Sequence, residues 1–517
     1  MKIEEMVNNF LLESKQFQLG QLPTEQPHPL TFDLSIKAQS DLASAIETFQ
    51  EVELAAFEKI LPALPHLETL KKDIRQTLQA GNKIYFCGCG ATGRLSVALE
   101  SLWRESSRAP HPDLLERVQG FIAGGDYALV KSIENFEDHP EFGAKQLMDL
   151  GFGKNDLLIS TTEGGETPFV IGATLQAAKI SNRSPYFLYC NPKESLRDIE
   201  RSQAIFMDKK IHDVSLEIGQ MAICGSTRLQ ASSVLYMACA LPLMSYLTAD
   251  LDIKSEIESY IQFLDQIDLT PLVDLVRLEA ATYQKFDFLT YHTSSNALGI
   301  LTDLTERSPT FSLRAVENKL DTSVRPATVN LTIDSAANSN EAWEQIIGRA
   351  PIALDWSDLD GKYNEDVVLG FDFSRLGLRF RQSLINQQTH HQVYIQEHEH
   401  EFEFKSDHFD LRMSRPSGVI PKNLFLKLIF NLASSLAMAM NFRVLGNVML
   451  YVRPSNKKLI DRAARYVQEI LKEQHNLNAP YRDVVKCIFY CKENQPGEDS
   501  VVLKSVEHYL SQLKSRG

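Results

Sequence analysis

The segment KIYFCGCGATGRL at residues 83–95 combines residue types that together can bind an anion. Its first residues predict a strand, its glycines predict a tight turn, and the apolar periodicity up to about residue 108 predicts a helix. Glycines let the backbone approach a ligand closely, and the free N–H groups at a helix start attract negative charge. The hydroxyl of Thr92 lies in the same turn. The candidate ligand-binding residues of this loop are Gly88, Gly90, Ala91, Thr92 and Gly93.

The same glycine spacing also occurs in dinucleotide-binding folds, so a second criterion is needed to identify the class of ligand. A dinucleotide site requires an acidic residue at the end of the next strand, roughly 20 residues further on. Here the next predicted strand ends in Ala123-Gly124-Gly125, and Asp126 follows Gly93 by 33 residues. The pattern therefore favours a phosphorylated sugar over a nucleotide. A structural turn without a ligand is the remaining alternative.

Two further polar loops have a similar setting. The loop TTEGGETP at 161–168 follows a predicted strand, and GSTRL at 225–229 precedes an apolar helix. In parallel α/β folds, such loops meet at the carboxyl ends of the strands, where ligands bind. Several converging loops are harder to explain by packing alone than one loop. They add the candidate ligand-binding residues Gly164, Gly165, Thr167 and Ser226.

Strand and helix patterns alternate along most of the chain, which predicts an α/β fold with parallel sheets flanked by helices. A charged helical stretch without glycine, at about 250–284, separates two such alternations. We expect an N-terminal arm and helix (1–50), two tandem flavodoxin-like units (51–250 and 251–455) and a C-terminal helical cap (456–517). The strands are expected at 83–87, 118–123, 156–160, 186–190, 286–291, 328–333 and 352–355, and helices at 91–108, 126–138 and 295–307.

The segment HEHEFEFKSDH at 398–408 is rich in residues that can ligate a metal. In a strand, the glutamates at odd positions from 397 to 403 share one face, and the histidines and phenylalanines at even positions share the other. This alternation predicts an antiparallel hairpin with a solvated acidic face, and a metal site is the weaker alternative. We expect neither a metal nor a cofactor.

Composition and charge limit the partners of the protein. The 517 residues are 44% hydrophobic and 23% charged, which predicts a globular protein, and the net charge of −14 disfavours nucleic acid or an anionic membrane. The first 15 residues lack the apolar core of a signal peptide. The apolar stretch 424–442 contains Lys427 and Asn431, which favours a buried helix over a membrane span. The seven scattered cysteines fit reduced thiols, so we expect a cytoplasmic protein.

Several of these motifs resemble one family. The run GCGATGRL resembles the glycine loop of the sugar-isomerase (SIS) domain. The likeness is closer still to the N-acetylmuramic acid 6-phosphate etherases and the animal glucokinase regulatory proteins. It extends through LPTEQPHPLT (22–31), FIAGGDYALVKSIENFED (121–138), EGGETPFVIGA (163–173), CNP (190–192), GSTRL, GILTDLTERSPTF (299–311) and FRVLGNVMLYVRPSNKKL (442–459).

The resemblance implies a protein with two tandem SIS domains that holds a sugar phosphate between them. It implies that Thr92 binds the phosphate and that Glu137 occupies the base position of the etherases. Their acid position falls on Leu102 in the first unit, which is a departure, and on Glu306 in the second unit. A basic residue that contacts the phosphate across the domain interface falls on Arg443.

Two further departures concern the loops. Gly164 stands where the family has a serine, which removes one expected phosphate contact. The loop HTSSNALG at 292–299, the counterpart of the glycine loop in the second unit, lacks the glycine pattern. One site shared between the two units is the simplest interpretation.

The function stays open between three classes. Two carboxyl groups in different environments can remove a proton and protonate a leaving oxygen, so Glu137 and Glu306 fit a lyase that cleaves lactate from N-acetylmuramic acid 6-phosphate. Leu102 and the duplication favour a non-catalytic sugar-phosphate sensor that regulates a sugar kinase, and an aldose–ketose isomerase is third. Without a ligand, Glu137 simply ends a helix, Glu306 pairs with Arg307, and Glu134 is solvated. The sugar, the protein partner and the choice between monomer and homodimer stay open.

Overall fold

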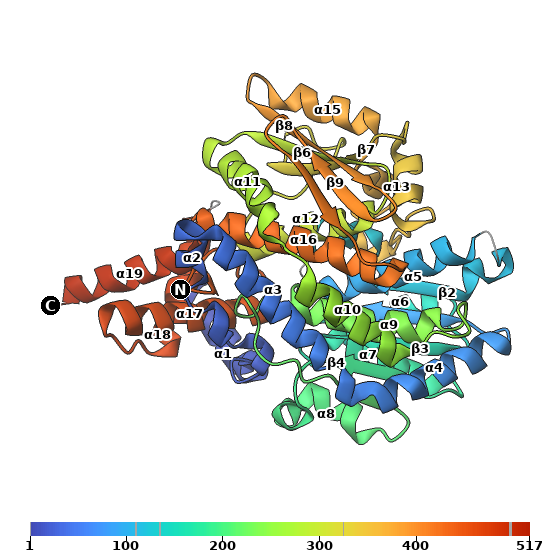
Figure 1. Cartoon of the computed structure of the whole chain (residues 1–517). Coiled ribbons are helices and arrows are strands. Elements are labelled where there is room, and N and C mark those ends of the chain that lie inside the picture. Colours follow the sequence, from blue (N-terminus) through green and yellow to red (C-terminus); the bar gives the residue numbers. More distant parts are fainter. Residues whose placement is uncertain (1, 109–110, 134–135, 324, 496–498, 517) are drawn as a thin grey trace.

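The computed structural model describes residues 2–108, 111–133, 136–323, 325–495 and 499–516, which form two α/β units and a set of C-terminal helices (Figure 1). The first sheet has the strand order β2-β1-β3-β4-β5, and all its neighbouring strands are parallel. This is the flavodoxin-like order. Its strands are β1 (Ile84–Gly88), β2 (Val118–Ile122), β3 (Leu157–Thr161), β4 (Tyr186–Tyr189) and β5 (His212–Ser215).

Helices cover both faces of this sheet, so β1, β3 and β4 are buried along their whole length. Side chains alternate between two core layers: Ile84 and Phe86 pack on one side of β1, and Tyr85 and Cys87 pack on the other. The first layer contains α4 (Leu64–Gln79), α5 (Ala91–Ser107) and α9 (Gln230–Met244), and the second contains α6 (Pro140–Asp149), α7 (Pro168–Ile180) and α8 (Glu200–Met207).

The second sheet is mixed, with the order β10-β9-β8-β6-β7. Strands β7, β6 and β8 are parallel, and β8, β9 and β10 are antiparallel. The predicted fold class is confirmed, except that the antiparallel hairpin is added to the parallel core. The strands are β6 (Phe288–Thr293), β7 (Val329–Ile333), β8 (His390–Glu397), β9 (Glu401–Lys405) and β10 (Asp410–Ser414), and the helices of this unit include α12 (Ala297–Phe311), α13 (Ser339–Ile347), α14 (Glu365–Leu369), α15 (Arg375–Ile385) and α16 (Val419–Met440).

The predicted hairpin around residue 400 is present, but its turn interrupts the alternation. Residues 398–400 connect β8 to β9, so only the part after residue 400 alternates as expected. Phe402 and Phe404 are fully buried against the core, because they lie on the inner face of β9. The histidines of this segment do not form a metal site: the described residues contain no group of three or more histidine, cysteine or acidic side chains placed to hold a metal ion.

Two predicted elements are wrong. The segment 126–138 contains only a short 3-10 helix (Asp126–Leu129), Glu137 lies in a turn, and Glu134 is outside the described residues. The segment 352–355 is irregular instead of forming a strand. Asp126 N donates to Ile352 O at 2.9 Å, and Ile352 N donates to the Asp126 carboxylate at 2.6 Å. These bonds use the backbone of the segment to fasten one unit to the other.

Four helices meet where the units join: α5 and α9 from the first unit, and α12 and α16 from the second (Figure 1). Helix α16 is long and apolar enough to cross a membrane, but most of it is buried inside the molecule, as predicted for a core helix. Inside it, Lys427 Nζ donates to Asn431 Oδ1 at 2.9 Å. The connection between the units is formed by α10 (Ile253–Gln266) and α11 (Val273–Lys285).

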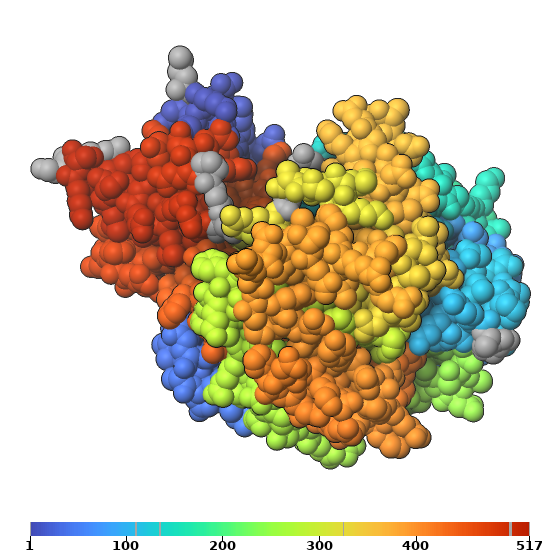
Figure 2. Space-filling view, turned by 90° about the horizontal axis from the view of Figure 1, so that it is seen from above, coloured from blue at the N-terminus to red at the C-terminus, as the bar shows by residue number. Residues whose placement is uncertain are grey.

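The C-terminal helices form a lobe at one side of the molecule together with the N-terminal helix (Figure 2). The lobe contains α17 (Lys457–His475), α18 (Tyr481–Asn494), α19 (Val501–Arg516) and α1 (Lys2–Glu13). Buried Glu25 of the N-terminal segment pairs with Arg462 and Arg465 of α17. Although burial opposes ionisation, these two cations lower the pKa of Glu25 to about 2. The pairs fix α17 beside the first unit, and α2 (Leu34–Ser40) and α3 (Leu42–Glu58) pack on α16.

Candidate functional site

A cavity of about 200 Å³ lies at the carboxyl end of the first sheet. Its walls come from the glycine loop after β1, residues 122–137, the loop at 225–228, the second half of α12, and residues 449–462 at the start of the cap. The predicted site residues Gly90, Ala91, Glu137, Ser226 and Glu306 all line it. The cavity thus joins parts of both units and of the cap.

Each of the three glycines in the loop is required for a different structural reason. Gly90 has φ = +57° at the N-terminal cap of α5, a conformation that L-residues rarely adopt. A Cβ on Gly88 would lie 2.3 Å from the backbone of Thr92, and a Cβ on Gly93 would lie 2.3 Å from the side chain of Ile122. The glycines therefore permit the turn, close the loop on itself and bring α5 against β2.

The N-terminus of α5 is directed at the cavity. Gly90 and Ala91 line the wall there, and the first N–H groups of a helix have no partner within the helix. Thr92 lies deeper: its hydroxyl donates to Cys89 O at 3.0 Å and accepts from Cys89 N at 3.2 Å. In this structure the Thr92 hydroxyl stabilises the loop. The N-terminus of α5, rather than this hydroxyl, faces the cavity.

Glu137 is held by two residues of the cap. Asn456 Nδ2 donates to its Oε2 at 3.1 Å, and Lys458 Nζ forms an ion pair with its Oε1. Burial opposes the charge of Lys458, but Glu137 and Glu166 outweigh it and raise the pKa of Lys458. Glu137 therefore has a cation beside its carboxylate, and Phe169 N fixes its backbone by donating to Glu137 O at 3.1 Å.

Glu306 has a different environment. It is buried, and the nearest cation is Arg94, whose Nη1 lies 3.8 Å from Glu306 Oε1. Burial raises the pKa of Glu306, and the positive charges of Arg94 and Lys427 oppose this only in part. The alternative pairing with Arg307 is wrong, because Arg307 forms buried ion pairs with Asp303 and Glu279.

The loop at 225–228 supplies a hydroxyl and a link between the units. Ser226 Oγ is buried, lines the cavity and has no hydrogen-bond partner among the described residues. Two residues later, Arg228 Nη1 forms a 2.6 Å ion pair with Asp303, one turn before Glu306 on α12. The loop that presents Ser226 is therefore fixed to the helix that presents Glu306.

A third carboxyl group lies close to the site. Glu163 is buried, and within the described part of the chain its Oε1 accepts no hydrogen bond. Burial raises its pKa to about 8, with smaller contributions from Glu137 and Glu306 and an opposing one from Lys458. Its loop, TTEGGETP, was singled out in the sequence for its glycines and hydroxyls, but Glu163 itself was not predicted.

The other predicted residues lie outside the described lining of the cavity. Gly164 O accepts from Asn191 at 3.0 Å, Gly165 packs against Leu196, and the Thr167 hydroxyl bonds to that of Thr162 at 2.9 Å. These contacts build the second loop without presenting it to the cavity.

Arg443 is also elsewhere. Its guanidinium donates to Phe311 O at 2.6 Å and lies over the ring of Tyr451. The cation that reaches the cavity from the C-terminal segment is Lys458, together with Arg462. In the sequence, Lys458 stands in the run SNKKL, where neighbouring basic residues look alike. Arg94, which directly follows Gly93, is also absent from the predicted site residues. Its burial depends on tertiary packing, which the local sequence does not indicate.

Comparison with known proteins identifies the proteins to which this chain is similar. The family described as "Glucokinase regulatory protein N-terminal SIS domain" matches residues 67–179. An N-acetylmuramic acid 6-phosphate etherase from Rippkaea orientalis is 34% identical over 219 residues, which cover 42% of this chain and 66% of that protein. The etherase from Aliivibrio fischeri is 28% identical over 220 residues, with coverage of 42% and 67%. The chain thus spans about two thirds of the length of these relatives.

Among solved structures, a tagatose-6-phosphate ketose/aldose isomerase from Escherichia coli covers 80% of this chain and 97% of its own, with 11% identity and a TM-score of 0.41. A likeness at this level carries no argument about ligand or activity. The family match to residues 67–179 includes the glycine loop that forms part of the cavity wall. The chain is a SIS-domain protein, related through residues 67–179 to the N-terminal SIS domain of glucokinase regulatory protein, and related also to the N-acetylmuramic acid 6-phosphate etherases.

Proposed function

We propose that this protein binds a sugar phosphate in the cavity between its two units. The observation that carries the proposal is the convergence of the α5 N-terminus, the free Ser226 hydroxyl and Lys458 on one cavity. A helix N-terminus, a hydroxyl and an ammonium group are the donors that a phosphate requires. The similarity to etherases of N-acetylmuramic acid 6-phosphate supports the same class of ligand.

A thermal-shift series tests this proposal. Fructose 6-phosphate and an amino-sugar 6-phosphate should raise the melting temperature, and the unphosphorylated sugars should not. A ligand at 100 times its dissociation constant adds about 2.7 kcal/mol to the stability of the folded protein. Equal shifts from the phosphorylated and unphosphorylated sugars would contradict a phosphate site.

A carbon–oxygen lyase is the finer function that two specific carboxyl groups favour. An elimination next to the carbonyl of an open-chain sugar needs a base that removes the adjacent proton and an acid that protonates the departing ether oxygen. Glu137, with Lys458 and Asn456 at its carboxylate, fits the role of the base, and Glu306, whose pKa burial raises, fits the role of the acid. Both line one cavity, so the loss of the acid at Leu102 leaves one complete pair.

Isotope exchange separates this lyase from a non-catalytic sensor. In deuterated water with N-acetylmuramic acid 6-phosphate, Glu306→Gln should stop lactate release but leave deuterium exchange next to the carbonyl, because proton removal precedes departure of lactate. Glu137→Gln should stop both reactions. A wild-type protein that binds the sugar phosphate and catalyses neither reaction is a sensor, for which regulation of a sugar kinase is the role we propose. Lactate release that survives both substitutions would place the chemistry on other residues.

A further inference from the structure

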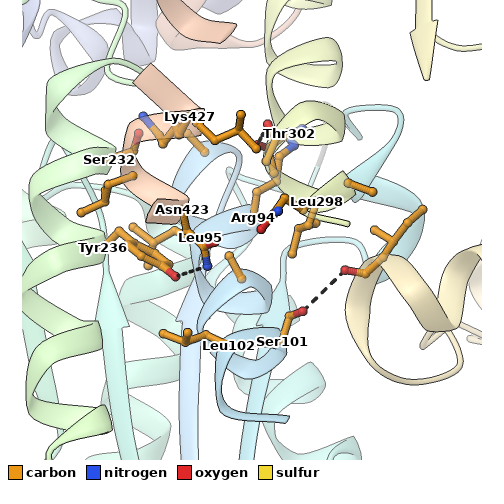
Figure 3. Close-up of a pocket in the computed structure, with 18 of the residues that line it drawn as sticks. Arg94, Leu95, Ser101, Leu102, Ser232, Tyr236, Leu298, Thr302, Asn423 and Lys427 are labelled. Carbon is orange, nitrogen blue, oxygen red and sulfur yellow. Dashed lines mark hydrogen bonds between the residues drawn. The ribbon is translucent and has the colours of Figure 1, made fainter. Parts of the chain in front are cut away.

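A second cavity, of about 130 Å³, shares Ala91, Arg94 and Glu306 with the candidate sugar site (Figure 3). It lies where α5, α9, α12 and α16 meet, so both units form its walls. The start of α12, which follows the degenerate loop of the second unit, lines one side. The two cavities are adjacent and differ in the rest of their walls, because the described lining of the sugar site includes neither α9 nor α16.

Much of the lining is apolar. Leu95, Ala98 and Leu102 of α5 face it, together with Leu298 of α12 and Leu424 of α16. An apolar cavity of roughly 150 Å³ holds a molecule the size of benzene. The space therefore suits a ligand of about six or seven non-hydrogen atoms with a short hydrocarbon body.

The polar lining of this cavity includes the buried guanidinium of Arg94. Arg94 is almost completely buried, and its Nε–H has no hydrogen-bond partner in the parts of the chain that the structure describes. Its Nη2 donates to neutral groups, Ala128 O at 3.0 Å and Ser132 Oγ at 3.3 Å. The nearest carboxyl, Glu306, lies at 3.8 Å, beyond hydrogen-bonding distance. A buried guanidinium with so little compensation attracts an anion.

Tyr236 and Asn423 form a second polar point. Asn423 Nδ2 donates to the Tyr236 hydroxyl at 3.4 Å, which leaves the hydroxyl proton of Tyr236 available to a ligand (Figure 3). Burial raises the pKa of Tyr236, so this group stays a neutral donor. It can bind an uncharged oxygen of a ligand whose anionic end lies at Arg94.

A phosphate is a poor match for this cavity. Glu105 and Glu306 both line it, and they would repel a dianion. In the loop before α12, the hydroxyl of Thr293 is used within the loop, because Thr293 Oγ1 donates to Ser295 O at 2.5 Å. This hydroxyl is therefore not directed at a phosphate. A single negative charge meets less repulsion and still satisfies Arg94.

We infer that this cavity binds a short hydroxy acid, with its carboxylate at Arg94, its hydroxyl at Tyr236 and its hydrocarbon body against Leu102 and Leu298. The inference does not depend on the identity of the sugar phosphate. Because Arg94 and Glu306 face both cavities, an occupant of one changes the electrostatic environment of the other.

Isothermal titration calorimetry with 3-hydroxybutyrate, butyrate and butyramide tests the site on the full chain. A ligand of this size should bind with a dissociation constant of about 1 mM. Butyrate, which lacks the hydroxyl, should bind about 3–10-fold more weakly, and butyramide, which lacks the charge, should show no heat. The absence of binding by both acids would overturn the inference, and fructose 6-phosphate binding in the same preparation would show that the sugar site is a separate question.

Two variants locate the bound acid. Ala98→Phe fills the cavity and should abolish binding of both acids. Tyr236→Phe should reduce the affinity for 3-hydroxybutyrate to that for butyrate and leave butyrate unchanged, whereas Tyr246→Phe, just beyond the end of the same helix, should change neither. Circular dichroism melting checks folding, and if Ala98→Phe does not fold, the Tyr236 comparison carries the test. Binding that both variants retain, and that fructose 6-phosphate displaces, would place the acid in the sugar cavity and overturn the inference.

Discussion

In both units the first loop leads from a strand into a helix, but the two loops lie beside different kinds of cavity. In the first unit, β1 leads through Gly88 and Gly90 into α5, and the helix end meets a polar cavity. In the second unit, β6 leads into α12 through Asn296 in the left-handed conformation, and the hydroxyl of Thr293 bonds within the loop. Glu306 of α12 lines both cavities, whereas Leu102 of α5 is part of the described lining of the second cavity only.

The cap makes this difference larger. Helix α17 begins beside the first unit and adds Lys458 and Arg462 to that cavity only, as far as the described linings show. We therefore propose that only one of the two pseudo-equivalent positions binds a phosphate, because a single C-terminal segment can supply its cation to only one of them. The following predictions test this asymmetry, beginning with the largest expected effect.

Removal of the cap's cation should have the largest effect. Lys458→Met should weaken binding of fructose 6-phosphate by about 30-fold or more, roughly 2 kcal/mol, because a desolvated charge pair is lost. The neighbouring Lys457 is more exposed and pairs with Glu13, so Lys457→Met is the matched control and should change affinity less than about twofold. Titration calorimetry measures both, and equal affinities for the two variants would show that the cap does not supply the phosphate cation.

Alanine in place of Gly93 in α5 and alanine in place of Gly299 in α12 should have opposite effects on stability. In Gly93→Ala the new Cβ would lie 2.3 Å from Ile122, which should cost about 1–3 kcal/mol. At Gly299, in the first turn of α12, no described atom outside its own helix and chain neighbours lies within 4 Å of an added Cβ. Gly299→Ala should therefore stabilise the protein by about 0.5–1 kcal/mol. Urea unfolding measures both, and effects of the same sign would contradict the comparison of the two loops.

The buried Glu163 should make stability depend on pH. Its pKa in the folded protein is about 8, above the ordinary value of 4.5, so the neutral form is favoured by folding. Its contribution is fully present below about pH 4.5 and is lost as the pH rises through 8, by an amount on the order of a few kcal/mol. Between pH 5 and 8, the melting temperature of the wild type should therefore fall relative to that of Glu163→Gln. Glu399→Gln, at an exposed site, should follow the wild type, and parallel curves for all three proteins would rule out this role for Glu163.

The smallest effect on binding is expected at Arg443. Its contacts with Phe311 O and Tyr451 lie away from the cavity, so Arg443→Gln should lower the free energy of unfolding by about 1 kcal/mol. Its effect on sugar-phosphate affinity should be below about twofold. A loss of affinity as large as that of Lys458→Met would restore Arg443 as the phosphate cation that the family resemblance implies.

Local patterns predicted the parts of the site that depend on local geometry. The glycine spacing at 88–93 requires a turn whatever surrounds it, and the alternation around residue 402 requires an inner and an outer face. The helix predicted at 126–138 is wrong beyond the 3-10 turn Asp126–Leu129, and Glu137 is held instead by Asn456 and Lys458, more than 300 residues away. A contact of that kind has no signal in the residues next to it.

From the sequence follow two α/β units, a candidate anion-binding loop after β1 and, through the family resemblance, the candidate carboxyl groups Glu137 and Glu306. The tertiary structure decided which of these groups meet. It brought Lys458, rather than Arg443, to Glu137, and it buried Arg94 and Glu163 beside the cavity. The physical reason is that charge state and function depend on distance and desolvation, which packing between remote segments creates. Spacing along the chain fixes only which residues can share a turn, a strand or a helix.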